Sequence, residues 1–223
     1  MTFSLIARCQ QTGMFGVAIT SSSPAVAARC AFVRADVGAV VSQNITDPRL
    51  GERALTLMAN GATATAALDN LASGENMSYR QLMAVDGSGE TAIFSGSHTL
   101  GVNAEAKTQN AASAGNLLAN TAVPTAVVDG FFTAQGHFGE RLVAALEAGL
   151  RAGGEAGPLH SAGIKIAYQT AWPFVDLRCD WSDDCPVAAL RRAWEVYQPQ
   201  MDDYVQRALA PAKSPSFGVP GDE

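Results

Sequence analysis

Short apolar runs separated by polar turns dominate the first part of the chain. Residues 3–8 and 14–21 are two such runs around the turn QQTG, a pattern that predicts a β-hairpin. Residues 37–43 (VGAVVSQ) are almost continuously apolar, as expected for a strand that is buried on both faces. Residues 80–85 and 90–94 flank DGSG, whose Asp-Gly pair is favoured in hairpin turns. The pattern therefore predicts antiparallel strands.

Helices are expected where apolar positions recur every three or four residues. One helix begins at Asp47 and is stopped by Gly61, and a second covers residues 63–71. Ser23 suits the N-cap of a further, short helix. Three later helices are expected at residues 123–134, 138–152 and 186–209.

The remaining segments add strands. Residues 96–116 are rich in Gly and Ala and predict short strands joined by tight turns, and residues 161–168 and 174–179 predict two more strands. The elements do not alternate as they do in a doubly wound sheet. We therefore expect an α+β fold of two mostly antiparallel sheets with helices outside. Residues 1–210 are expected to form a single domain, and residues 211–223 a mobile, Pro-rich tail.

Composition narrows the functional classes. Of the 223 residues, 48% are hydrophobic and 16% are charged, as expected of a globular protein. The net charge of −6 and the absence of a basic run argue against binding to nucleic acid or to an anionic membrane. No signal peptide and no apolar stretch of ~20 residues is visible, so a cytoplasmic location is expected.

The sequence predicts no cofactor and no metal. The cysteines lack CxxC spacing and the histidines are scattered, so reduced thiols are expected rather than a zinc site. A phosphate-binding loop of the GxxxxGK[ST] type is absent. The residues concerned are Cys9, Cys30, Cys179, Cys185, His98, His137 and His160.

Thr2 is the main candidate for chemistry. A threonine hydroxyl needs a nearby base before it can act as a nucleophile. If Met1 is removed, Thr2 carries an α-amino group with a pKa of ~7.7–8.0, and one residue then supplies both nucleophile and base. If Met1 stays, the Thr2 nitrogen is an amide and cannot be a base. Thr2 would then be an ordinary residue of an edge strand.

Three further residues are candidates for an acyl-transfer site around Thr2. Asn116 and the backbone N–H of Gly115 would hold a developing oxyanion. Ser21 ends the strand that pairs with the first one, so it would lie beside Thr2 and orient the Thr2 amine. The alternatives are structural: Asn116 closes a turn, and the serines at 21–23 cap a helix.

Residues near two strand ends are candidates for substrate binding. Ser42, Gln43 and Asn44 end an apolar run, where polar groups often line a site, and Gln43 would hold a substrate amide. Asp176 and Arg178 lie two apart on a strand, so they face the same side, and the guanidinium would bind a carboxylate. The alternatives are hydrogen bonds to loop backbone for the first group and a structural salt bridge for the second.

A different enzyme class would use His160 together with Asp176 and Arg178. This hypothesis requires that the three side chains converge on one cleft. His160 also precedes Ser161, but neighbours on a strand point to opposite faces, so a Ser–His pair is not expected.

Five segments of the chain are distinctive as a set. They are MTFSLIAR, GVAITSS, VGAVVSQNITDPRLGERALTLMANG, AGNLLAN and WPFVDLRCDWSDDCPVAALRRAWEVY. Together they resemble a bacterial family catalogued as domain of unknown function number ten twenty-eight, from Thr2 to about Tyr197. Members of that family look like N-terminal-nucleophile (Ntn) hydrolases in fold. The resemblance implies a four-layer αββα sandwich, and it implies no settled substrate.

Two segments depart from the pattern of that family. Ala114 stands where the family form QGNLL has its Gln, so the contact from that Gln is not expected here. GGEAGPLHSA resembles a segment that more often carries Asp-Arg-Arg-Gly-x-Gln before Ser-Ala. Glu155, Leu159 and His160 occupy part of that segment, and its charged groups are expected to have a different role.

The residues and the resemblance together favour an Ntn-type amidohydrolase that cleaves a small amide or peptide-like substrate, with Thr2 as nucleophile. The alternative is a non-catalytic small-molecule-binding protein on the same fold, since a fold does not fix a function. A small-molecule partner and a homodimer are expected, and neither nucleic acid nor a membrane.

Overall fold

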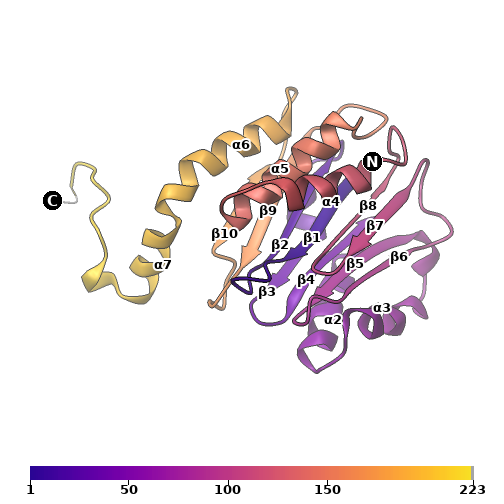
Figure 1. The fold of residues 1–223 in the computed structure, drawn as a ribbon, viewed down its shortest axis with the longest axis horizontal. Coiled ribbons are helices and arrows are strands. Elements are labelled where there is room, and N and C mark those ends of the chain that lie inside the picture. Colours follow the sequence, from indigo (N-terminus) through magenta and orange to yellow (C-terminus); the bar gives the residue numbers. More distant parts are fainter. Residues whose placement is uncertain (222–223) are drawn as a thin grey trace.

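Two antiparallel sheets form the centre of the fold (Figure 1) in the computed structural model, which describes residues 1–221. The larger sheet contains, in spatial order, β10 (Val175–Cys179), β9 (Ser161–Ala167), β2 (Phe15–Ser21), β1 (Thr2–Arg8), β8 (Ala111–Asn116) and β7 (Ala104–Thr108). The smaller sheet contains β3 (Ala31–Arg34), β4 (Gly38–Asn44), β5 (Arg80–Asp86) and β6 (Thr91–Ser95). The β1–β2 and β5–β6 hairpins confirm the predicted antiparallel pairs.

Helices cover the outer faces of both sheets (Figure 1). The larger sheet is covered by α4 (Val123–Thr133) and α5 (Phe138–Arg151), and the smaller sheet by α2 (Pro48–Ala59) and α3 (Ala64–Ala72). The order across the molecule is therefore helix, sheet, sheet, helix. This arrangement confirms the expectation of two antiparallel sheets with helices outside.

Strand β1 is central, because it pairs with β2 on one side and with β8 on the other. This corrects the alternative that Thr2 starts an edge strand. Phe3 and Leu5 pack in the apolar core under α4 and α5, whereas Ile6 lies in a second core between the two sheets. Successive side chains of a strand point to opposite faces, so Thr2 and Ser4 share the face of Ile6 and point between the sheets.

Two helix predictions are wrong in detail. The helix expected at residues 186–209 is divided into α6 (Pro186–Tyr197), a 3₁₀ turn (Gln198–Gln200) and α7 (Met201–Leu209). Pro199 lies in that turn, and a proline cannot donate the backbone hydrogen bond that a continuous helix needs. The short helix α1 (Val26–Cys30) begins after Ala25 rather than after Ser23.

The remaining elements lie in connections and near the C-terminus. They are the 3₁₀ helices η1 (Met77–Tyr79) and η3 (Pro211–Lys213), the latter within the predicted Pro-rich tail. Residues 222–223, the end of that tail, lie outside the described residues. Within the described part of the chain, no helix combines the length and the apolar character that a membrane span requires.

Candidate functional site

Thr2, Ser21 and Asn116 lie side by side across three strands. Thr2 on β1 is opposite Ser21 on β2 and opposite Asn116 on β8, so all three side chains share the face between the sheets. Thr2 is 7% exposed, and Ser21 and Asn116 are buried. The structure thus brings together the three residues that the sequence singled out as catalytic candidates.

The carbonyl oxygen of Met1 is the centre of the local hydrogen bonding. Thr2 Oγ1 and Ser21 Oγ each donate to it, at 2.5 Å in both cases. The two hydroxyl oxygens are 3.3 Å apart. Ser21 Oγ also accepts the backbone N–H of Ser23 at 3.0 Å, which fixes the direction of its own donated bond. Two hydroxyl groups therefore converge on one carbonyl at the start of β1.

Glu155 is a buried carboxyl near this carbonyl, and it was not among the predicted site residues. It forms an isolated β-bridge with Leu118, just after β8, and its Oε2 accepts the backbone N–H of Ser22 at 3.1 Å. Glu155 is 6% exposed, and its Oε1 has no hydrogen-bond partner among the described residues. Burial raises the pKa of the Glu155 carboxyl to about 8, and the nearby α-ammonium of Met1 opposes this rise.

A network of buried amide side chains lies between the two sheets, next to Thr2, Ser21 and Asn116. Ser4 Oγ donates to Gln43 Oε1 at 2.6 Å, and Gln43 Nε2 donates to Gln81 Oε1 at 2.7 Å. Asn116 Nδ2 donates to the same Gln81 oxygen at 3.2 Å. Gln43 and Gln81 are fully buried. The structure therefore places Gln43 in an internal network that supports Asn116, rather than on a surface that a substrate reaches.

The two neighbours of Gln43 point elsewhere. Ser42 lies on the other face of β4, where its hydroxyl donates to the carbonyl of Asp47 at 2.9 Å. Asn44 has a positive φ of 69°, which asparagine tolerates better than most residues. Its Nδ2 donates to the carbonyl of Tyr79 at 2.7 Å. Neither residue joins Thr2, and their contacts match the alternative of hydrogen bonds to loop backbone.

Gly115 lies next to Asn116 on β8, and its position explains its lack of a side chain. A Cβ atom there would lie 2.6 Å from Cδ2 of Leu118, which is too close. The Gly115 carbonyl accepts a hydrogen bond from Gln81 Nε2 at 3.4 Å. Gly115 thus lies on the strand that pairs with β1, and its observed role is in packing.

Asp176 and Arg178 are not brought together with Thr2. They lie on β10, which β9 and β2 separate from β1, and adjacent strands are about 4.8 Å apart. Asp176 pairs with Lys165 at 3.4 Å and Arg178 with Asp180 at 3.3 Å, so the salt-bridge alternative describes their contacts.

His160 has partners of its own. Its ring stacks on that of Trp181 at 4.2 Å between centroids, and its Nδ1 lies 2.8 Å from the carbonyl oxygen of Ser182. The three side chains of the second enzyme hypothesis, those of His160, Asp176 and Arg178, thus make their described contacts with different partners.

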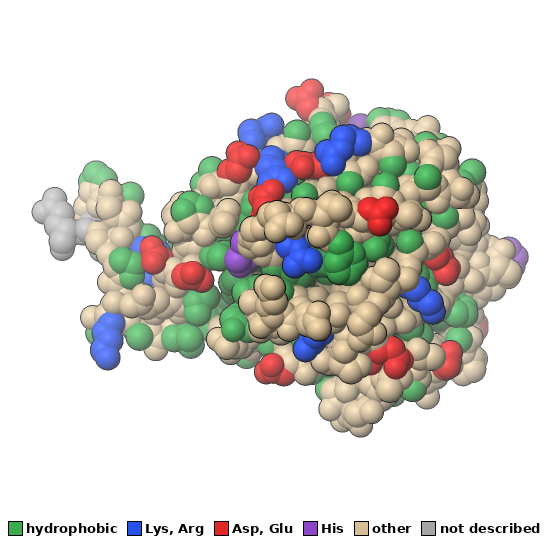
Figure 2. Space-filling view, viewed as in Figure 1, with side chains coloured by type: hydrophobic (Ala, Val, Ile, Leu, Met, Phe, Trp, Pro, Cys, Tyr) green, Lys and Arg blue, Asp and Glu red, His purple; other side chains and the backbone are tan. Residues whose placement is uncertain are grey.

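A cavity of about 350 Å³ adjoins the start of β1. Its lining includes Glu155, Gly157, Leu159, Asp183 and Asp184, and none of its lining residues is a Lys or an Arg. Negative charge therefore dominates this cavity. Over the face drawn in Figure 2, by contrast, basic and acidic side chains are interspersed.

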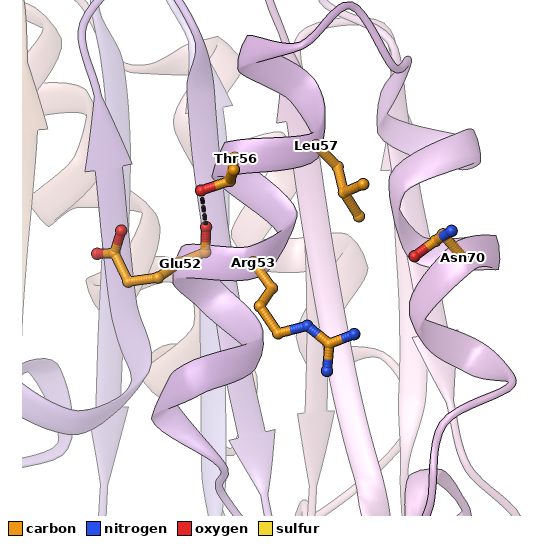
Figure 3. Close-up of a pocket in the computed structure, with 5 residues that line it drawn as sticks. All are labelled: Glu52, Arg53, Thr56, Leu57 and Asn70. Atoms are coloured by element: carbon orange, nitrogen blue, oxygen red, sulfur yellow. Dashed lines mark hydrogen bonds between the residues drawn. The ribbon is translucent and has the colours of Figure 1, made fainter.

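A second concave surface lies between α2 and α3 (Figure 3), with a volume of about 290 Å³. Leu57 and Asn70 face each other across it, and most of its side chains are exposed. It covers the outer face of the smaller sheet, whereas Thr2 belongs to the larger sheet. It contributes nothing to the site around Thr2.

The described residues offer no evident metal site, since no three His, Cys, Asp or Glu side chains among them are grouped for one. All four cysteines are free thiols; Cys9 and Cys30 are buried, Cys179 is half-buried and Cys185 is exposed.

The comparisons with known proteins identify a family. A family model described as "Family of unknown function (DUF1028)" matches residues 2–190. A crystal structure of a Silicibacter pomeroyi protein of that family has 28% sequence identity and a TM-score of 0.85, covering 92% of this chain and 90% of that chain. No curated protein matches the chain.

More distant structures also align over nearly the whole chain. The Gly-1 mutant of Anbu from Hyphomicrobium sp. strain MC1 has 13% identity and a TM-score of 0.42, covering 98% of this chain and 100% of that chain. Anbu (ancestral beta-subunit) from Yersinia bercovieri has 11% identity and a TM-score of 0.39, covering 97% and 100%. These scores are too low to support an argument about function. The family model, in contrast, spans most of the sequence, and the chain therefore belongs to the family of unknown function DUF1028.

Proposed function

We propose that this protein is an Ntn-type amidohydrolase that cleaves a small amide or peptide-like substrate, with Thr2 as the nucleophile after removal of Met1. The main support is the position of Thr2 at the start of a central strand, where its hydroxyl and that of Ser21 point at the same carbonyl oxygen. A nucleophile and a hydrogen-bond donor for an oxyanion are the two groups that acyl transfer requires.

The reaction follows from these groups. Thr2 Oγ1 forms a bond to the carbonyl carbon of the substrate, and its proton passes to the neutral α-amine of Thr2. Ser21 Oγ donates to the carbonyl oxygen as negative charge develops on it. The C–N bond then breaks, and the leaving amine takes the proton from the Thr2 ammonium. Water attacks the resulting ester, releases the acid and restores the Thr2 hydroxyl.

Asn116 has a supporting role in this proposal. Its amide donates to Gln81, which in turn is held by Gln43, so the amide has a defined orientation beside Thr2. One N–H of its amide remains for the substrate, because an Asn side chain carries two donors on Nδ2. Ser42, Gln43, Asn44, Asp176 and Arg178 have no direct role in the proposed site.

The alternative is a protein that binds a small molecule without cleaving it. It uses the same fold without a free amine on Thr2, since a fold does not fix a function. The two functions are separated by an amidase screen of protein whose loss of Met1 has been verified by intact mass, with Thr2→Ala in parallel. Hydrolysis that is lost in Thr2→Ala supports the amidohydrolase. Ligand binding that persists in Thr2→Ala, without any hydrolysis by the Thr2 protein, supports the alternative.

A further inference from the structure

Met1 lies where the acyl part of a substrate would lie. Its carbonyl oxygen accepts hydrogen bonds from Thr2 Oγ1 and from Ser21 Oγ, both at 2.5 Å. In the proposed reaction the acyl carbon is joined to Thr2 Oγ1, whereas in the structure it is joined to the Thr2 nitrogen. These two atoms are attached to neighbouring carbons of one residue. The Met1 carbonyl is therefore a close spatial substitute for the group that Thr2 would carry.

The α-ammonium of Met1 lies near a carboxyl that has a free oxygen. Glu155 is 94% buried, as its 6% exposure implies, and its Oε1 has no hydrogen-bond partner within the described part of the chain. An unpaired carboxyl oxygen in a buried site is costly unless a donor or a cation comes to it. Met1 influences this carboxyl electrostatically and does not donate a hydrogen bond to it.

The side chain of Met1 lies against Gly157. A Cβ atom at Gly157 would lie 2.8 Å from Met1 Cε and 3.3 Å from Met1 Sδ. Gly157 and Glu155 both line the cavity of about 350 Å³, and Asp183 and Asp184 add two more carboxyl groups to it. A space next to the proposed nucleophile thus combines an apolar contact with negative charge.

From this arrangement we infer that the substrates carry a free α-amino group: they are amides of α-amino acids, or short peptides cleaved after their first residue. Their first side chain is apolar and unbranched, as in methionine. Glu155 releases its proton when the substrate ammonium arrives and binds it as a carboxylate, and the place next to Gly157 receives the side chain. This inference rests on the proposed function, because it takes Thr2 as the group that receives the acyl part.

Binding is tested in the Thr2→Ala protein from which Met1 has been removed, because this protein cannot form the acyl intermediate. The ligands are L-methionine amide and N-acetyl-L-methionine amide, which differ by the charge on the α-nitrogen. Calorimetry should show that the free amine binds at least ~10-fold more tightly. Equal affinities, or no binding of either ligand, would overturn the inference.

Two further substitutions, each made in the Thr2→Ala protein without Met1, test whether Glu155 and Gly157 contact the ligand. Glu155→Gln should remove most of the preference for the free amine, whereas the control Glu105→Gln, at an exposed position on β7, should retain it. Gly157→Val should weaken binding of methionine amide at least ~10-fold and leave glycine amide unaffected, since only the larger side chain reaches this position. If Glu155→Gln does not fold, the comparison of the two ligands and the Gly157→Val result still decide the matter.

A parallel assay of the Thr2 protein without Met1 separates this inference from the proposed function. Tight binding of methionine amide by Thr2→Ala, with no hydrolysis by the Thr2 protein, would refute the amidohydrolase and leave the binding site for amino-acid amides in place. Hydrolysis of the N-acetylated amide as fast as the free amine would refute the substrate class and leave the amidohydrolase in place.

Discussion

Ser21 lies directly opposite Thr2 in the β1–β2 pair, and their hydroxyl oxygens are 3.3 Å apart. Both hydroxyls donate to the Met1 carbonyl, and the Ser23 N–H holds Ser21 Oγ in place. Ser21 is therefore placed to donate a hydrogen bond to the oxyanion in the proposed reaction. The sequence had suggested Asn116 for that role, but the described hydrogen bond of the Asn116 amide goes to Gln81.

Ser21→Ala is therefore expected to lower kcat by about 10²–10³-fold, because it removes a donor to the developing oxyanion. KM should change much less, since this bond strengthens as charge develops. Steady-state kinetics on a hydrolysed amide measure both constants. Ser22→Ala is the matched control, because it makes the same chemical change one residue away and keeps the backbone N–H that Glu155 accepts. Equal kinetics in the two variants would exclude Ser21 from the reaction.

The stability of the protein should depend on pH through Glu155. Burial raises the pKa of its carboxyl from 4.5 to about 8. Between these values the folded protein holds a proton that the unfolded chain has released, so the free energy of unfolding falls as the pH rises. The slope is at most ~1.4 kcal/mol per pH unit for one group. The Met1 α-ammonium is the charged group that opposes this rise in pKa, and the carboxyls of Asp183 and Asp184 line the same cavity.

Glu155→Gln carries no such proton, so its stability should fall less over the same pH interval. Urea unfolding of both proteins at a series of pH values measures the difference. We expect the wild type to lose stability relative to Glu155→Gln as the pH rises from about 4.5 to about 8. Parallel pH profiles would show that the carboxyl titrates as it does in the unfolded chain.

The buried amide network should matter for stability. Gln43→Ala removes the acceptor of Ser4 Oγ and the donor to Gln81 Oε1, and it leaves a cavity between the sheets. The expected loss is roughly 2–5 kcal/mol in the free energy of unfolding. Gln135→Ala, at an exposed position after α4, should change it by less than ~0.5 kcal/mol. A small loss in Gln43→Ala would mean that the sheets are held together without this network.

Replacement of Ser113 by alanine should stabilise the protein. It is fully buried on β8, and its hydroxyl has no hydrogen-bond partner among residues 1–221. Ser113→Ala removes the unsatisfied group and is expected to raise the free energy of unfolding by ~1 kcal/mol. Ser95→Ala is the contrasting variant, because Ser95 Oγ accepts the amide of Gln81 and its loss should destabilise the protein. Thermal unfolding of both variants shows whether each substitution stabilises or destabilises the protein.

Local patterns predicted the parts of the site that are close in sequence. The short turn between the first two apolar runs sets the register that places Ser21 beside Thr2, so this pair followed from the hairpin. The adjacency of Asn116 to Thr2 depends on a pairing between distant strands, which no local pattern determines. Asn116 was found through the AGNLLAN segment, and its actual partner, Gln81, was not.

Other features could not be found from the sequence for physical reasons. Glu155 lies in the Gly-rich segment GGEAGP, which has no periodicity, and its burial arises from contacts with Leu118 and Ser22. A single carboxyl between small apolar residues was the only signal for it. Gln43 was correctly identified as a polar residue in a buried strand, but its direction depends on how the two sheets stack. Pro199 should have ended the last predicted helix, because proline interrupts the hydrogen bonding of a helix.

The nucleophilic role of Thr2 is tested most directly by mass spectrometry of active protein that has been incubated with methionine p-nitrophenyl ester and quenched in acid. We predict a chain that begins at Thr2 and a methionyl adduct that maps to the peptide containing Thr2, with no adduct in Thr2→Ala. Full activity in protein that retains Met1, or an adduct on any other residue, would contradict the account.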